Sequence, residues 1–195
     1  MTDLLLVSAS PRRRELLTMI GVGFDVYPAD IDESPRADEA PDALVLRLAE
    51  GKLRAGIAVQ GERRPALGAD TLVLLDGEIL GKPVDRAHAR DMLSRLSGNV
   101  HEVLSAVAVY RPDGKVRRAL NRTRVTFGEI PADWIASYSR LEEPMDKAGA
   151  YAIQGLTAQW VRHIDGSYSG VMGLPLFETA ELLRWAGIQT GGEVA

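Results

Sequence analysis

The sequence predicts an α/β protein built on a mixed sheet. Short apolar runs that are typical of strands alternate with longer segments of approximately helical spacing, which is the pattern of βαβ units. Two pairs of strand-like runs are joined by tight turns, Asp76-Gly77 and Pro112-Asp113-Gly114, which predict hairpins. Because a hairpin joins antiparallel strands while a βαβ unit joins parallel ones, we expect both kinds of pairing.

Turn residues and changes of periodicity bound each expected element. Glycines stop the first helix near residue 21, prolines flank several helix starts, and Gly187 ends the last helix. The expected strands cover about residues 3–8, 24–29, 66–75, a short return run after Gly77, 101–110, 115–127 and 160–166. The expected helices cover about residues 11–20, 41–59, 85–96, 131–140 and 174–187.

The length of 195 residues suits one domain, or one domain with two lobes, and no repeat or linker divides it. We therefore expect residues 1–195 to form a single domain, with a frayed C-terminal tail. The residues are 46% hydrophobic and 26% charged, which is ordinary for a soluble globular protein. The start of the chain has no basic region with a long apolar run, and no stretch is long enough to span a membrane. We expect a soluble cytoplasmic protein.

Composition also excludes several kinds of chemistry. The chain has no cysteine, so disulfides, thiolate zinc sites and a cysteine nucleophile are excluded. Its three histidines, His88, His101 and His163, are scattered without metal-ligand spacing. The formal net charge of −4 argues against a protein that coats nucleic acid, whose whole surface would be basic. Any site for an anion must therefore be a local cluster of cations.

The segment SASPRRR (8–14) joins the first expected strand to the first helix. Ser10 is a favourable N-cap, and Pro11 is a favourable first helical residue. Three arginines then lie at a helix N-terminus that is already positive and that binds anions through its unpaired N–H groups. We expect Arg12, Arg13 or both to bind phosphate, and the third arginine to be solvated. The alternative is a basic surface turn paired with nearby acids.

Separated carboxylates provide candidate groups for metal binding or proton transfer. Asp70, in the motif GADT, follows a strand that should be buried, so its carboxylate needs a partner, a metal ion or a catalytic role. The alternative is a turn aspartate bonded to neighbouring N–H groups. Glu33, in an acidic loop, could hold magnesium with Asp70 and substrate phosphate oxygens, or could simply be solvated. Lys82 lies in a rigid Gly-Lys-Pro turn, where most lysines are solvated.

The segment EPMDKAGAYAIQG (143–155) combines small residues, a charged pair and an amide. Gln154 offers both a donor and an acceptor, which suits the edge of a nucleobase. The alternative is a helix N-terminus with Lys147 at the surface. A further segment, GSYSGVMGLP (166–175), is expected to form a glycine-rich bend before the last helix.

The order of these motifs closely resembles that of the Maf family of nucleoside triphosphate pyrophosphatases. Over about residues 4–185 the chain presents SASPRRRELL, Glu33, Lys52 in RLAEGK, GADT, GKP, LSGNVHEV, EPMDKAGAYAIQG and GSYSGVMGLPL. The resemblance implies an elongated, twisted mixed sheet flanked by helices, with two lobes and a central cleft, related to inosine triphosphate pyrophosphatases. It implies hydrolysis of a nucleoside triphosphate to the monophosphate and pyrophosphate, a divalent cation (Mg²⁺ or Mn²⁺), and a homodimer.

The resemblance also implies roles for individual residues. Asp70 is expected to accept the proton of the attacking water, and Glu33 and Asp70 are expected to hold the metal ion. The other residues of the expected catalytic set are Lys52 and Lys82. The expected substrate-binding residues are Ser8, Ser10, Arg12, Arg13, Thr71, Asp146, Lys147 and Gln154.

At Arg12, Thr71 and Gln154 the chain resembles the branch of the family that hydrolyses dTTP and UTP. CTP and modified pyrimidine nucleotides are further expected substrates. The branch that hydrolyses 7-methyl-GTP is expected to differ at all three places. A non-catalytic nucleotide sensor that regulates cell division is a second possible function, but it would have no need of a complete catalytic set. A nucleic-acid-binding module is a third, and it is disfavoured by the acidic net charge and the few aromatic residues.

Overall fold

The computed structural model describes residues 4–61 and 63–191. Its strands are β1 Leu4–Val7, β2 Phe24–Val26, β3 Ala66–Leu75, β4 Glu78–Leu80, β5 Val100–Tyr110, β6 Val116–Phe127 and β7 Val161–Asp165. Its α-helices are α1 Pro11–Met19, α2 Pro41–Gln60, α3 Arg86–Leu96, α4 Ala132–Tyr138, α5 Tyr168–Met172 and α6 Leu176–Trp185. Three 3₁₀ turns are η1 Glu143–Asp146, η2 Ala148–Ala150 and η3 Leu156–Trp160.

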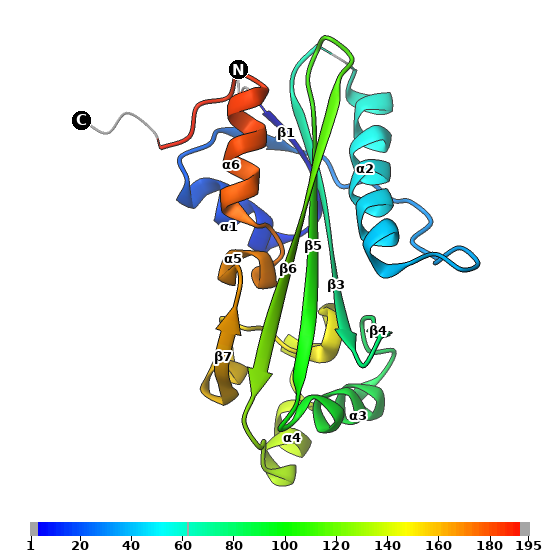
Figure 1. Cartoon of the computed structure of the whole chain (residues 1–195), viewed down its shortest axis with the longest axis vertical. Coiled ribbons are helices and arrows are strands. Elements are labelled where there is room, and N and C mark those ends of the chain that lie inside the picture. The colour runs from blue at the N-terminus through cyan, green and yellow to red at the C-terminus, as the bar shows by residue number, and fades with distance from the viewer. Residues whose placement is uncertain (1–3, 62, 192–195) are drawn as a thin grey trace. The chain divides into compact units, whose positions relative to one another are not determined.

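The strands of the described residues form one seven-stranded mixed sheet, which confirms the predicted fold class (Figure 1). The strand order is β2-β1-β3-β5-β6-β7, and β4 pairs with β3. β1 pairs in parallel with β2 and β3, whereas β4 and β7 are antiparallel to β3 and β6. Asp76 and Gly77 both have positive φ, +51° and +83°, as the tight turn of a two-residue hairpin requires.

Most expected elements are found within a few residues of their expected bounds. The strand expected over 24–29 ends at Val26, and the expected bend at 166–175 contains the short helix α5. Residue 3, where the sequence places the start of the first strand, lies outside the described residues, as does the end of the tail at 192–195. No helix within residues 4–61 and 63–191 is long and apolar enough to cross a membrane.

Contacts divide the chain into two compact units. The first comprises Met1–Asp70, Ser105–Asn121 and Gly173–Ala195, and the second comprises Thr71–Leu104 and Arg122–Met172. Strands β3, β5 and β6 each contribute residues to both units. The expectation of a single domain over residues 1–195 stays a prediction.

In the first unit, α2 lies on one side of β1 and β3, and α1 and α6 lie on the other (Figure 1). Two glycines allow α2 to approach the strands closely. A Cβ on Gly68 would lie 2.4 Å from the carbonyl oxygen of Ala49 and 2.7 Å from the amide nitrogen of Leu53. A Cβ on Gly56 would lie 2.4 Å from a methyl carbon of Val7. Only hydrogen fits at either position, so the backbones of helix and strand are almost in contact.

The second unit has its own hydrophobic core, which includes α3, α4 and the ends of β5 and β6. His101, Phe127 and Tyr151 pack their rings together at its centre, with centroids 5.0 to 5.3 Å apart. The Nε2 atom of His101 lies 2.7 Å from the hydroxyl of Tyr151, while its Nδ1 atom is buried without a hydrogen-bond partner. Burial lowers the pKa of His101 to about 4, so the imidazole is neutral in the folded protein.

This buried imidazole makes stability depend on pH. The pKa of His101 is depressed from an ordinary value of 6.5, so below pH 6.5 the unfolded chain takes up a proton that the folded chain refuses. Between pH 7 and pH 5 we expect His101 to lower the free energy of unfolding by about 2 kcal/mol. Urea unfolding at both pH values should show that the free energy of unfolding falls less for His101→Gln than for wild type. An equal loss of unfolding free energy in His101→Gln and in the exposed-site control His163→Gln would contradict this expectation.

Candidate active site

The connection from β1 to α1 is built around the hydroxyl of Ser8. Ser8 is buried, and its Oγ accepts hydrogen bonds from the amide of Ser10, at 3.1 Å, and from Arg13 Nη1, at 3.3 Å. Ser10 occupies the N-cap position of α1, but its side chain makes no capping hydrogen bond. The predicted N-cap residue is therefore confirmed, although its hydroxyl does not supply the capping bond. The hydroxyl that organises the turn belongs to the residue two positions earlier.

The side chain of Arg13 is bound by two segments of the first unit that are far apart in the sequence, at Ser8 and at Gly173. Its Nε donates to the carbonyl oxygen of Gly173 at 2.8 Å. Burial lowers the pKa of the Arg13 guanidinium, and the neighbouring carboxylates of Asp70 and Glu33 act in the opposite direction. A guanidinium remains a cation at neutral pH, so Arg13 is a desolvated positive charge close to these two acids. Arg12 is half-buried, and the third arginine of the run is exposed.

Lys52 brings the two predicted metal-binding carboxylates together. Its Nζ lies 2.5 Å from Asp70 Oδ1 and 2.7 Å from Glu33 Oε1. Asp70 is only 6% exposed, whereas the side chain of Glu33 is about half exposed, so the cluster has one inner and one outer carboxylate. The partner that the buried Asp70 requires is therefore the ammonium of Lys52 on α2. The close contact of Gly68 with α2 accounts for this geometry, because Gly68 lies on the same face of β3 as Asp70.

The same geometry allows a test of whether this cluster suits a divalent cation. Oxygen atoms of Glu33 and Asp70 converge on one positive group, and carboxylate oxygens are the donors that magnesium and manganese prefer. In residues 4–61 and 63–191 no cluster of three or more His, Asp or Glu side chains could hold a metal ion. Two carboxylates fit an ion that takes its other ligands from substrate phosphates and water.

The loop that carries Glu33 is attached to α2 by Arg47. Arg47 makes a two-point ion pair with Glu39, at 2.6 and 2.7 Å, and its Nη2 also donates to the carbonyl oxygen of Ser34 at 3.0 Å. Hydrogen bonding to Arg47 lowers the pKa of Glu39 to about 2. The amide of Ser34 donates to Asp32 Oδ1 at 2.9 Å, which tightens the turn around Glu33. Arg47 thus fixes the backbone next to the outer carboxylate.

The remaining predicted site residues lie in the second unit. The amide of Gly149 donates to the carbonyl oxygen of Gly81 at 3.1 Å, so the turn that carries Lys82 lies against η2. Lys82 and Gln154 are exposed, and Thr71 is half-buried. The other two predicted residues, Asp146 and Lys147, form an ion pair with each other, and Lys147 Nζ also donates to the carbonyl oxygen of Glu143 at 2.5 Å.

Sequence reasoning missed two groups that support the cluster of Lys52, Glu33 and Asp70 and the neighbouring Arg13. The carbonyl oxygen of Gly173 accepts from Arg13, and Arg47 anchors the loop of Glu33. The motif GSYSGVMGLP drew attention to the segment that contains Gly173, but a backbone acceptor leaves no mark in the side-chain pattern. Arg47 is one of two arginines on α2, and only the fold identifies its partner.

Comparison with known proteins shows the relationship directly. The family model described as Maf-like protein matches residues 3–186. The dTTP/UTP pyrophosphatase of Methylobacillus flagellatus is 51% identical over 193 residues, which cover 98% of this chain and 96% of that protein. The dTTP/UTP pyrophosphatase of Escherichia coli is 49% identical over 183 residues, 94% of this chain and 92% of that protein. A solved structure, the Ham1 protein of Staphylococcus aureus, aligns at a TM-score of 0.43 with 13% identity, over 80% of this chain and 90% of its own.

A match of this length, together with identities near 50% over almost the whole chain, confirms the resemblance inferred from the order of the motifs. The chain belongs to the Maf family.

Proposed function

We propose that this protein hydrolyses dTTP and UTP to the nucleoside monophosphate and pyrophosphate. The observation that carries the proposal is the cluster in which Lys52 joins Glu33 and Asp70 beside the desolvated Arg13. Relatives that are about half identical to this chain over almost its whole length are named dTTP/UTP pyrophosphatase, which supports the choice of substrate.

The triphosphate binds to two cations, Arg13 and Lys52, that lie near acids. Arg13 and Lys52 lie within the field of Glu33 and Asp70, and both can donate hydrogen bonds to phosphate oxygens. When Lys52 turns toward the phosphate chain, Asp70 loses its ammonium partner. The carboxylate is then available to accept a proton from a water molecule.

The chemical step is a displacement at the α-phosphorus. Asp70 accepts a proton as the water oxygen forms a bond to phosphorus, and the bond between the α-phosphorus and the bridging oxygen to the β-phosphate breaks. The bridging oxygen leaves with pyrophosphate, whose charge is neutralised by Lys52, Arg13 and Lys82. When bound at Glu33 and Asp70, a magnesium or manganese ion supplies additional positive charge to the phosphate oxygens.

Base recognition is assigned to Arg12, Thr71 and Gln154. Gln154 is exposed and follows a buried segment that is tied down by a hydrogen bond from Thr157 Oγ1 to the carbonyl oxygen of Ala152, at 2.6 Å. An amide on this anchored turn can donate to one atom of a pyrimidine edge and accept from another. Asp146 and Lys147 remain candidate substrate contacts, provided that their ion pair opens when substrate binds.

Exchange of this amide for a carboxylate tests the base assignment. Gln154→Glu removes the donor and adds a negative charge, so we expect kcat/KM for dTTP and UTP to fall by about tenfold or more. The ranking among dTTP, UTP, CTP and GTP should change as well. Gln60→Glu, an exposed change at the end of α2, is the matched control. An unchanged substrate profile in Gln154→Glu would refute a base-reading role.

The anchor of the Glu33 loop gives a second test. Arg47→Met frees the backbone beside Glu33, and we expect kcat to fall between about tenfold and a hundredfold, because small displacements of catalytic groups are costly. Arg47→Lys cannot make the two-point pair, so its kcat should lie between that of Arg47→Met and that of wild type. Arg54→Met removes an exposed arginine that pairs with Glu50 on the same helix and serves as control. Equal kcat values in Arg47→Met and Arg54→Met would show that the loop needs no anchor.

Pyrophosphate release from dTTP, UTP, CTP, GTP and 7-methyl-GTP, with and without Mg²⁺ or Mn²⁺, tests the function as a whole. We expect metal-dependent release that is fastest with dTTP and UTP. Preference for 7-methyl-GTP would assign the chain to the other specificity. Tight nucleotide binding without release would instead support a sensor that regulates cell division.

The resemblance also implies a homodimer, and the composition of the chain led us to expect a cytoplasmic location. Light scattering during size-exclusion chromatography tests the first, and a mass equal to that of one 21.2 kDa chain would exclude it. Fractionation of the source cells tests the second.

A further inference from the structure

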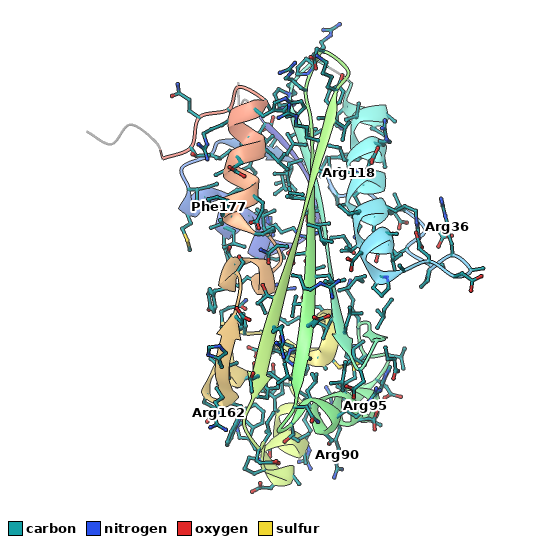
Figure 2. All side chains as sticks on the ribbon, viewed as in Figure 1. Arg36, Arg90, Arg95, Arg118, Arg162 and Phe177 are labelled. Carbon is teal, nitrogen blue, oxygen red and sulfur yellow. The ribbon has the colours of Figure 1, made fainter. Side chains whose placement is uncertain are left out.

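The outward arginines of β6 are not used by the proposed function, and the structure gives them different partners. Arg118 donates to Glu50 on α2 at 2.9 Å, and Arg122 pairs with Glu102 (Figure 2, where Arg118 is labelled). Arg117 lies instead over the indole ring of Trp185, with its guanidinium carbon 4.7 Å from the ring centroid. Among the described residues, no carboxylate forms an ion pair with Arg117.

Arg117 belongs to a basic hollow in the first unit. The hollow has a volume of about 520 Å³ and is lined by Arg111, Lys115, Val116, Arg117 and Trp185. This volume is in the range of sites that hold small molecules. The lining comes from the tip of the hairpin between β5 and β6 and from the end of α6, so none of the residues of the candidate active site takes part.

Trp185 orients two of the cations. Arg111 and Arg117 both place their guanidinium groups on its ring, 4.9 and 4.7 Å from the centroid. Such stacking is favourable and restricts the movement of both side chains. Because two guanidiniums already lie against the indole, the ring serves to hold cations and not to stack on a nucleobase.

The charges of the hollow favour an anion with more than one negative charge. The only carboxylate paired with these lining residues in the described part of the chain is that of Asp113, which contacts Arg111 and lies 3.3 Å from Lys115 Nζ. One negative charge thus faces three positive ones. Guanidinium groups bind phosphate oxygens in a two-point geometry, and the ammonium of Lys115 adds a mobile point charge.

We propose that this hollow binds an oxyanion that carries at least two negative charges, namely inorganic pyrophosphate or the phosphate chain of a nucleotide. Pyrophosphate is a product of the proposed reaction, so the site would respond to the outcome of turnover. Its residues are separate from Arg13, Lys52 and Asp70, and binding there requires no hydrolysis.

The indole N–H signal of Trp185 in a nitrogen-15 NMR spectrum reports on the hollow. The chain has three tryptophans, so the signal is assigned by its absence in Trp185→Phe. In metal-free buffer we expect pyrophosphate to shift this signal with a saturable dependence on concentration. Arg117→Gln and Lys115→Gln should each weaken the apparent affinity, the first by at least about tenfold. Arg90→Gln, which removes an exposed charge on α3 (labelled in Figure 2), should leave it unchanged.

Two further measurements identify the ligand and exclude a general effect of ionic strength. Equal shifts with dTMP and pyrophosphate would assign the site to the phosphates of nucleotides as well, and a response to pyrophosphate alone would assign it to the free anion. A shift reproduced by KCl at the same ionic strength, or an affinity unchanged in both Arg117→Gln and Lys115→Gln, would overturn the proposal. Because the readout needs no turnover, it is independent of whether dTTP is hydrolysed.

Discussion

Asp70→Asn is expected to lower kcat for dTTP by at least about a hundredfold, because a carboxamide cannot accept the proton of the attacking water. The change keeps the size of the side chain, and Lys52 retains its second partner, Glu33. We therefore expect the fold and the binding of substrate to survive. The effect should appear in kcat, with KM changed by less than about threefold.

Steady-state kinetics of wild type, Asp70→Asn and Asp91→Asn provide the measurement. Asp91 is an exposed residue of α3, so its amide variant controls for the loss of one negative charge. Circular dichroism and thermal unfolding establish that each variant is folded. A kcat for Asp70→Asn within a few-fold of wild type would exclude Asp70 as the proton acceptor.

Gly68→Ala is expected to cause a large loss of stability. The added methyl carbon would lie 2.4 Å from the carbonyl oxygen of Ala49 and 2.7 Å from the amide of Leu53, so the α2 backbone must move. Such overpacking costs about 1–3 kcal/mol in the free energy of unfolding. Lys52 lies in the same turn of α2, and movement of this turn should separate it from Asp70. We expect kcat to fall together with stability.

Urea unfolding of Gly68→Ala and Gly128→Ala separates close contact from the general effect of replacing glycine. A Cβ on Gly128 meets only the carbonyl oxygen of Trp160, at 3.8 Å, which is an ordinary contact. We expect its free energy of unfolding to stay within about 0.5 kcal/mol of wild type. Similar stabilities for the two variants would show that the approach of α2 to β3 does not depend on Gly68.

Local signals predicted most of the elements correctly. Pro11 and the glycine at 187 bound helices as expected, and Asp76-Gly77 forms the expected tight turn. Those signals act over a few neighbouring residues, so they can be recognised in the sequence alone. The order of the strands in the sheet depends on long-range packing, which no local pattern encodes.

The sequence singled out three side chains that the structure brings together, but it did not predict their contacts. Residue chemistry singled out Glu33 and Asp70, and the resemblance to a family added Lys52. The structure shows that one ammonium joins both carboxylates, a contact between segments that are far apart in the chain. The roles of Arg47 and of the Gly173 carbonyl follow from hydrogen bonds across 13 and 160 residues, and such partners cannot be inferred from spacing.

Attack of water on the α-phosphorus is tested most directly by hydrolysis of dTTP in water enriched in oxygen-18. Mass spectrometry of the products then shows which phosphorus was attacked. We expect one labelled oxygen in dTMP and none in pyrophosphate. Label in pyrophosphate with unlabelled dTMP, or release of dTDP and labelled orthophosphate, would contradict the mechanism and with it the assignment of Asp70.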